Sequence, residues 1–280
     1  MLKRATCTLF AVATCGCVGT PTPLAPNVSG SVGFPHEGVQ TGAVELPRRG
    51  FGYARYRPYG RAYWGQPRLI QAIEAVAARV ARELPGGLPL VLGDLSSKSG
   101  GRIPRHNSHR SGRDVDLLWY LQTPNGRPVR AQGFIKVGAD GLARSPRDGT
   151  FYRLDIPRQW LTVKAFLELP DTDIQWMFCS RNIEALLIQH AISLGESDEL
   201  IWRAQNVLLQ PGDSLPHDDH IHLRLVCSED ELLRGCHGGG PHWHWLPAPP
   251  SLARLTDEDL QEIGQSDPLR VDDPRAVPSG

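Results

Sequence analysis

Apolar residues recur at helical spacing between Pro67 and Pro85. They are Leu69, Ile73, Val76, Val80 and Leu84. Residues three and four positions apart lie on one face of an α-helix, so this stripe predicts a single amphipathic helix. Proline fits the first turn of a helix and the pair Pro85–Gly86 ends one, so both ends of the helix are marked in the sequence.

The remaining pattern mixes strands and helices without a regular period. Apolar or alternating runs predict strands over residues 88–96, 114–121, 173–180 and 220–227. Helical spacing predicts helices over 154–169, which Asp155 is placed to cap, and over 181–195, which ends at Gly195. Hairpin-like loops such as 123–128 intervene. We therefore expect an α+β fold with a central, mainly antiparallel sheet flanked by helices.

The start of the chain has the pattern of an export signal. Lys3 and Arg4 precede an apolar run that ends near Cys15 and Cys17, which is typical of a secretory signal peptide over residues 1–17. A lipid anchor on either cysteine and a cleaved, soluble form are both compatible with this pattern. No later stretch approaches the roughly 18 apolar residues that a membrane-spanning helix needs.

Composition divides the rest of the chain into three parts. Residues 18–45 are rich in Pro, Gly, Ser and Thr and are predicted to form a tether. Residues 46–248 contain the predicted helices and strands and would form one domain, and residues 249–280 would form a polar tail. The 30 basic and 30 acidic residues cancel, so no overall field favours nucleic acid as a partner.

Export changes how the later cysteines are interpreted, because an oxidising compartment permits disulfides. Cys227 and Cys236 enclose a short loop and are predicted to form a bridge. Closing a loop of this size would stabilise the fold by roughly 2–3 kcal/mol on the chain-entropy model. Cys179 lies in an apolar run and is expected to be a buried, inert thiol.

Two histidine-rich segments are each joined to a predicted strand. The residues are His106, His109, Asp114 and Asp116 in "HNSHRSGRDVDLLW", and His217, His220 and His222 in "HDDHIH". A loop histidine, a carboxylate at the start of one strand and a histidine on another strand can bind one ion and leave a fourth position for water. Three protein ligands plus water is the geometry of catalytic zinc.

Strand periodicity groups some of these side chains. Residues two apart on a strand point to the same face, so His220 lies beside His222, and Asp114 lies beside Asp116. Asp114 could therefore hold a ligand histidine from behind the metal, or it could make only a hydrogen bond at the strand edge. The sequence leaves both roles open.

The segments "SHRSGRDVDLLW" and "HDDHIHLRL" together resemble the penicillin-insensitive murein endopeptidases, a branch of the lysostaphin-type and D-alanyl-D-alanine metallopeptidase superfamily. The family pattern is His, six residues, Asp, and a distant His-x-His, and the resemblance covers residues 46–247. It implies that His109, Asp116 and His222 bind one zinc ion per chain. It further implies that His220 is the catalytic histidine, with His217 as a second candidate and His106 lining the site.

The resemblance also implies an activity and a place. The family cleaves D-alanyl to meso-diaminopimelyl crosslinks of peptidoglycan in the periplasm without a serine nucleophile, which explains its insensitivity to β-lactams. Peptidoglycan would be the partner, and the membrane would be contacted only through an N-terminal lipid anchor. A D-Ala-D-Ala carboxypeptidase or dipeptidase, and an inactive zinc-stabilised wall-binding module, are the alternatives. Imidazole and carboxylate also suit other divalent ions, with zinc as the first choice.

Two further segments contain unusual residues. Residues 48–68 interleave arginines with aromatic residues and have no acid. In an exported protein we expect this segment to wrap over the domain or to line a groove, where arginines could face stem-peptide carboxylates. Residues 236–245 contain His237, His242 and His244 without an accompanying acid, so we expect a glycine-rich loop at the rim of the cleft rather than a second metal site.

Overall fold

The computed structural model describes residues 29–212, 214–238 and 240–247. The predicted signal peptide, the first part of the predicted tether and the predicted tail, residues 249–280, lie outside the described residues. Within the described part of the chain, no helix combines the length and apolar character that crossing a membrane requires.

A seven-stranded sheet forms the centre of the molecule, in the order β14-β13-β15-β8-β7-β5-β4. Its strands are β4 (Arg49–Gly50), β5 (Tyr53–Arg55), β7 (Leu90–Leu92), β8 (Asp114–Leu118), β13 (Ile174–Phe178), β14 (Leu208–Leu209) and β15 (His220–Leu225). The pairings from β13 through β15 and β8 to β7 are antiparallel, whereas β5–β7 and β13–β14 are parallel. The predicted α+β fold is thus confirmed, with a mixed sheet that is antiparallel at its centre.

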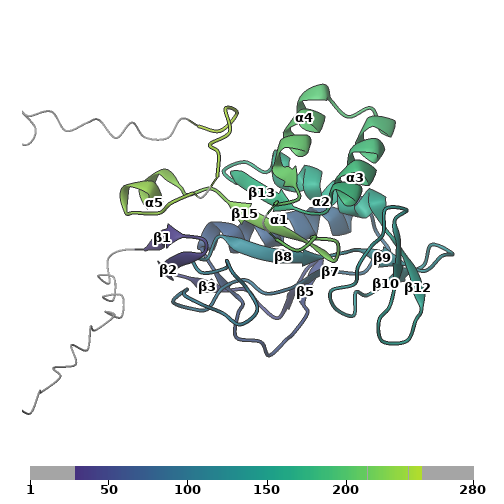
Figure 1. Cartoon of the computed structure of the whole chain (residues 1–280), viewed down its shortest axis with the longest axis horizontal. Coiled ribbons are helices and arrows are strands. Elements are labelled where there is room, and N and C mark those ends of the chain that lie inside the picture. Colours follow the sequence, from purple (N-terminus) through teal and green to yellow (C-terminus); the bar gives the residue numbers. More distant parts are fainter. Residues whose placement is uncertain (1–28, 213, 239, 248–280) are drawn as a thin grey trace, which may run out of the picture.

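Helices cover one side of this sheet, and α1 and α2 lie behind its strands in Figure 1. The helices are α1 (Pro67–Glu83), α2 (Ile156–Glu168), α3 (Arg181–Ser193), α4 (Asp198–Val207) and α5 (Glu229–Leu233). The predicted apolar stripe of α1 is buried from Leu69 to Val80. Asp155 caps α2 by accepting a hydrogen bond from the backbone N–H of Arg158 at 3.2 Å. The three helices predicted from periodicity are therefore confirmed as α1, α2 and α3.

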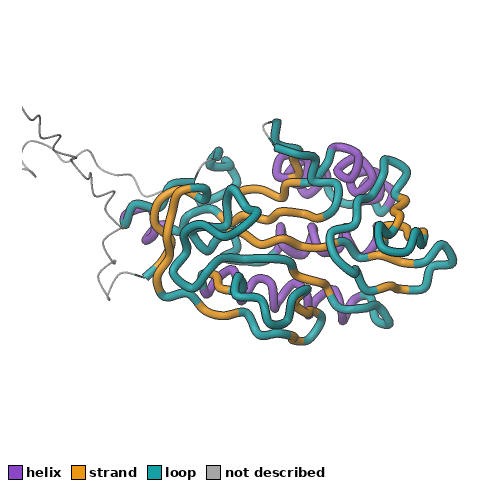
Figure 2. Tube along the Cα trace, turned by 60° about the horizontal axis from the view of Figure 1, so that its bottom comes forward, coloured by secondary structure: helices purple, strands orange, loops and turns teal. Residues whose placement is uncertain are grey.

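Smaller sheets surround the central one, as Figure 2 shows. They comprise β1 (Gly30–Phe34) with β2 (Glu37–Thr41), β3 (Val44–Glu45) with β6 (Trp64–Gly65), and a four-stranded sheet of β9 (Leu121–Gln122), β10 (Pro128–Val129), β11 (Leu142–Arg144) and β12 (Phe151–Leu154). The expected turn at 123–128 joins β9 to β10 as an antiparallel hairpin.

The structure differs from the predicted tether over residues 30–45. The β1–β2 hairpin belongs to the folded body, because Ser31 is fully buried and its backbone N–H donates to the Glu231 carboxylate at 2.9 Å. The Ser31 hydroxyl also donates to the carbonyl of Ser111, in the loop that carries His109. The glycines that favoured a tether serve the hairpin instead: Gly33 has φ +77°, and a Cβ there would lie 2.5 Å from the Glu37 carbonyl oxygen.

The cysteines are placed as expected, whereas the arginine-rich segment is built into the central sheet. Cys227 and Cys236 form the predicted disulfide, and Cys179 is a buried free thiol. In the segment 48–68, Arg55 is 3% exposed, lies over the Tyr63 ring and donates to the Leu46 carbonyl. The expected wrapping over the domain is not found, because this segment supplies β4 and β5 of the central sheet and the short strand β6.

Candidate metal centre

The register between β8 and β15 brings the predicted site residues together. His222 lies directly opposite Asp116, and Arg224 lies opposite Asp114. Opposed residues in antiparallel strands have Cβ atoms only about 4.5–5.5 Å apart, on one face of the sheet. Val115 and Leu117 point to the opposite face, into the core. The acidic residues of β8 therefore face the candidate site, and the apolar residues between them pack into the core.

The loop before β8 carries His109 to this face in a strained conformation. His109 has φ +63°, which costs a residue with a side chain about 1–2 kcal/mol. The buried Ser96 hydroxyl stabilises the loop by donating to the His109 carbonyl at 2.5 Å and accepting from the Gly112 N–H at 3.1 Å. Gly112 has φ +78°, and a Cβ there would lie 1.7 Å from Gln40 Oε1. A strained loop residue at a site is consistent with a functional constraint.

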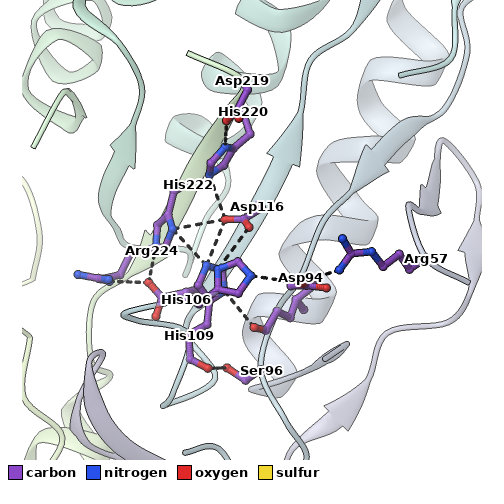
Figure 3. Close-up of polar contacts among 12 residues, drawn as sticks. Arg57, Asp94, Ser96, His106, His109, Asp116, Asp219, His220, His222 and Arg224 are labelled. Carbon is purple, nitrogen blue, oxygen red and sulfur yellow. Dashed lines mark hydrogen bonds and ion pairs between the residues drawn. The ribbon is translucent and has the colours of Figure 1, made fainter. Parts of the chain in front are cut away.

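Three potential ligand atoms form a compact triangle, shown in Figure 3. His109 Nε2 lies 3.1 Å from Asp116 Oδ1 and 3.2 Å from His222 Nδ1, and His222 Nδ1 lies 3.4 Å from Asp116 Oδ1. Tetrahedral ligands at about 2.0–2.1 Å from a zinc ion are about 3.3 Å from one another. The triangle therefore has the dimensions of one face of a zinc coordination tetrahedron.

The Asp116 carboxylate supports a cation at this position. It is 1% exposed, and within the described residues neither of its oxygens has a hydrogen-bond donor. Burial acts to raise its pKa, but His109 and His220 outweigh burial and hold the pKa well below its usual range. A buried, ionised carboxylate is costly unless a counter-charge accompanies it. The donor set thus fits a divalent metal ion.

Hydrogen bonds behind the triangle fix the tautomers of both histidines. His109 Nδ1 donates to the Leu95 carbonyl at 2.9 Å, so the neutral ring has its lone pair on Nε2. His222 Nε2 donates to Asp114 Oδ1 at 2.8 Å, which leaves the lone pair on Nδ1. Both lone pairs belong to the nitrogens of the triangle. Such partners are characteristic of metal-binding histidines.

Asp114 is ionised by its surroundings. It is fully buried, and Arg224 Nε donates to the same carboxylate oxygen as His222, at 2.6 Å. Burial acts to raise the pKa of Asp114, but Arg224 and His222 hold it far below its usual range. Of the two roles that the sequence left open, the contact with His222 is the one present in the structure.

His220 lies beside the triangle. Its Nε2 is 3.4 Å from Asp116 Oδ1, and its Nδ1 is bonded to Asp219 Oδ1 at 2.5 Å. Burial acts to lower the pKa of His220, but Asp116 and Asp219 raise it to about 10. The Phe134 ring meets the imidazole edge-on at 5.1 Å between centroids. The ring of His220 is therefore held by Asp219 at Nδ1 and by Phe134 on one side, while Nε2 faces Asp116.

His217 has a different environment. Its ring lies 5.2 Å from His220 and 5.9 Å from Phe178, and its buried Nδ1 has no hydrogen-bond partner among the described residues. Burial and the neighbouring histidines lower its pKa to about 4. It is a neutral imidazole at the border of the site.

His106 completes the cluster on the far side. Its Nε2 is hydrogen-bonded to Asp94 Oδ2 at 3.1 Å, and its Nδ1 lies 3.9 Å from Asp116 Oδ2. Within each of two sets, His106–His109–Asp116 and His217–His220–His222, the ligand atoms lie within 4.8 Å of one another. All the predicted site histidines and both aspartates thus lie in one cluster.

Several residues at the site were not singled out from the sequence: Asp94, Ser96, Phe134, Phe178, Asp219 and Arg224. Asp219 and Arg224 lie in or beside the second histidine segment, so their position was a usable signal. The histidines of the 236–245 loop stay apart from the cluster: His237 stacks on Phe34, and His244 packs on Trp202. Within the described residues, neither group of potential metal ligands includes His237, His242 or His244.

An α+β domain with two histidines and a carboxylate around one position, and another histidine beside them, defines a candidate metal-dependent hydrolase. A family model described as penicillin-insensitive murein endopeptidase matches residues 31–141, which include the first histidine segment. The penicillin-insensitive murein endopeptidase of Salmonella paratyphi C (strain RKS4594) is 27% identical over 211 residues, covering 74% of this chain and 70% of the relative. The proteins of the same name from Salmonella paratyphi B (strain ATCC BAA-1250 / SPB7) and Salmonella newport (strain SL254) are 28% identical over 212 residues, with the same coverage. The resemblance of this chain to that family is confirmed.

Proposed function

We propose that this protein is a zinc-dependent murein endopeptidase that hydrolyses D-alanyl to meso-diaminopimelyl crosslinks between peptidoglycan stem peptides. The observation that carries the proposal is the triangle of His109, Asp116 and His222, with edges of 3.1–3.4 Å and both imidazole lone pairs directed into it. The family resemblance supplies the substrate class.

Two neutral histidines and one carboxylate would leave a bound zinc ion with a net positive charge. Zinc in such a site supplies a Lewis acid and lowers the pKa of a bound water to about 7. The chain provides the orientation, since the Leu95 carbonyl and Asp114 fix the ligand rings from behind.

The remaining tasks are proton transfer and stabilisation of charge on the scissile carbonyl. His220 is placed for both, because Asp219 holds the Nδ1 proton and Nε2 faces the site. His217 lies next to it as a neutral group that can contact the substrate. Phe134 and Phe178 flank these histidines and reduce the access of bulk water.

Digestion of purified sacculi with the zinc-loaded protein tests the proposal. Chromatography and mass spectrometry of the products should show crosslinked dimers converted to monomers. Loss of terminal alanine without loss of dimers would instead identify a carboxypeptidase or dipeptidase. Binding to sacculi without any new product would identify an inactive wall-binding module.

The same proposal places the protein in the periplasm, exported by residues 1–17 and, on one alternative, anchored by a lipid. The Cys227–Cys236 disulfide supports an oxidising compartment. Fractionation of cells, with mass spectrometry of the mature N-terminus, distinguishes the cleaved form from the lipid-anchored one.

A further inference from the structure

An aromatic row leads away from the proposed catalytic histidine. The Phe134 ring lies edge-on to His220 at 5.1 Å and edge-on to Tyr56 at 6.0 Å. The guanidinium of Arg57 lies 5.4 Å from the centre of the Tyr56 ring. Three consecutive contacts thus connect the edge of the metal centre to an arginine.

A polar row leads from the metal centre to the same arginine. His106 Nδ1 lies 3.9 Å from Asp116 Oδ2, and His106 Nε2 is bonded to Asp94 Oδ2 at 3.1 Å. Arg57 NH1 lies 3.6 Å from that same Asp94 oxygen. In Figure 3 Asp94 lies between the histidine cluster and Arg57. The two rows form a closed ring of contacts that begins and ends at the metal centre, with Arg57 on its outer side.

The backbone at Arg57 is held in place. The N–H of Tyr56 donates to the Leu92 carbonyl on β7 at 2.7 Å, and the N–H of Arg57 donates to the Tyr63 hydroxyl at 3.0 Å. The carbonyl of Arg57 accepts from the N–H of Gly60 at 2.9 Å. Little backbone ordering is therefore needed when the side chain meets a ligand.

The guanidinium of Arg57 has unused donors. Its side chain is 39% exposed, and within the described residues its contacts are the 3.6 Å ion pair and the Tyr56 ring, neither of which is a hydrogen bond. Arg55 and Arg68 of the same segment are instead bound to Glu45 and Glu231 at 2.9 and 3.0 Å. Arg57 is the arginine of this segment that combines exposure with a place beside the site.

We infer that Arg57 binds a stem-peptide carboxylate next to the scissile bond and so determines substrate specificity. The inference rests on the proposed function. In a D-alanyl to meso-diaminopimelyl crosslink, the scissile nitrogen is attached to a carbon that also carries a free carboxylate. A guanidinium fork matches a carboxylate in two parallel hydrogen bonds, which a neutral amide cannot accept equally well.

Four forms of the full-length, zinc-loaded protein test the inference: wild type, Arg57→Gln, Arg57→Lys, and Arg61→Gln as the matched control. Arg61 is an exposed arginine of the same segment. The substrates are a crosslinked muropeptide dimer, the dimer amidated at the carboxylate beside the scissile nitrogen, and the dimer amidated at the free diaminopimelyl carboxylate of the donor stem. The kcat and KM are measured for each pair, with zinc content as a check on the site.

On the free-acid dimer, Arg57→Gln should lower kcat/KM by roughly ten- to hundredfold, mainly through KM, with zinc content unchanged. Arg57→Lys should recover part of the loss, and Arg61→Gln should match wild type. Amidation at the recognised carboxylate should lower kcat/KM of wild type by a similar factor. It should not lower kcat/KM of Arg57→Gln any further. This pattern should appear with the dimer amidated beside the scissile nitrogen. The same pattern with only the donor-stem amide would place Arg57 away from the scissile bond and overturn the inference.

Other results overturn the inference. If wild type cleaves all three dimers equally well, Arg57 binds neither carboxylate. The same conclusion follows if the factors by which Arg57→Gln and each amidation lower kcat/KM multiply. In both cases the endopeptidase proposal stands. If zinc-loaded wild type cleaves none of the dimers, the proposed function itself fails, and the role of Arg57 fails with it.

Discussion

At the scale of single residues, the histidines of the site differ in what holds their second ring nitrogen. Asp116 Oδ1 lies within 3.1–3.4 Å of nitrogens from His109, His222 and His220. Only His109 and His222 have their second nitrogen bonded to the protein body behind the site, whereas Asp219 holds the second nitrogen of His220 at the border. The first two histidines are therefore suited to hold a metal ion and the third to act beside it.

Replacing His222 with alanine should remove most of the bound zinc and abolish turnover. The substitution leaves two ligands, and it removes the donor that Asp114 accepts from inside the protein. Metal analysis of the purified protein measures the loss, and circular dichroism checks the fold. His237→Ala, outside the cluster, should keep its zinc. Stoichiometric zinc in His222→Ala would contradict the ligand assignment.

Replacing His220 with alanine should leave zinc content and thermal stability near normal while lowering kcat by roughly a hundredfold or more, the usual cost of losing a positioned acid or base. Kinetics on a crosslinked dimer and metal analysis of the same sample provide the measurement. His242→Ala, an exposed histidine bonded to the Pro247 carbonyl, serves as the control. Loss of zinc in His220→Ala, or near-normal kcat, would mean that the roles of His220 and His222 are reversed.

At the scale of elements, Glu231 joins three parts of the fold. Its buried carboxylate accepts from Ser31 N at 2.9 Å, from Ser228 N at 2.8 Å and from Arg68 at 3.0 Å, which connects β1, α5 and α1. Burial acts to raise the pKa of Glu231, but Arg68 and the backbone N–H groups lower it below its usual value. The folded state therefore favours the ionised carboxylate.

Glu231→Gln should lower the free energy of unfolding by about 1–3 kcal/mol at neutral pH, because an amide replaces a carboxylate that accepts charge-assisted hydrogen bonds. A carboxyl group whose pKa is lower in the folded than in the unfolded state contributes its full stability above the unfolded-state pKa. This contribution is lost as the pH falls through the folded-state pKa. The difference from wild type should hold above the unfolded value of 4.5 and shrink below it. Urea unfolding at several pH values measures it. The exposed Glu229→Gln should change stability by less than about 0.5 kcal/mol. A difference that persists at low pH would contradict the ionic role.

Sequence patterns predicted the long elements, and they predicted that the candidate site residues lie on or next to strands. They did not predict the small sheets. The stripe of α1 and the acid–apolar alternation of β8 extend over enough positions to show a period. Strands of two or three residues, such as β9 and β10, have too few positions to show any period, and the glycines of β1–β2 favoured a tether. The helix α4 carried a usable signal, because Ser197 caps it and Leu200, Ala204 and Val207 form its buried face.

At the candidate site, too, the sequence indicated some residues, and tertiary packing supplied the others. The spacing of two in β8 and β15 predicted that Asp114 lies beside Asp116 and His220 beside His222, whereas the set of His109, Asp116 and His222 followed from the family resemblance. Asp94, Ser96 and Phe134 could not be predicted, because each reaches the site through tertiary packing of a loop against another segment. Local patterns therefore indicated the candidate metal ligands, whereas only the folded arrangement indicated which groups surround them.

At the scale of the whole molecule, the candidate metal centre joins segments that are distant in sequence. His109 comes from the loop before β8, Asp116 from β8 itself and His222 from β15. Three segments meet at one position, and a buried ionised carboxylate lies among them. A bound cation would therefore stabilise the fold as a whole, since ligands that bind only the native state add to its free energy of unfolding.

A chelator should lower the melting temperature of the intact protein and stop cleavage of crosslinked dimers, and added zinc should restore both. Removing the metal leaves the buried Asp116 carboxylate without a cation, and the folded state loses the free energy of metal binding. His222→Ala is the matched control: its melting temperature should already be low and should not respond to the chelator. A β-lactam should leave cleavage unchanged, because the proposed chemistry uses no serine nucleophile. Calorimetry and dimer cleavage on the same samples measure these effects. A melting temperature and an activity that both survive chelation would refute a metal centre at this position.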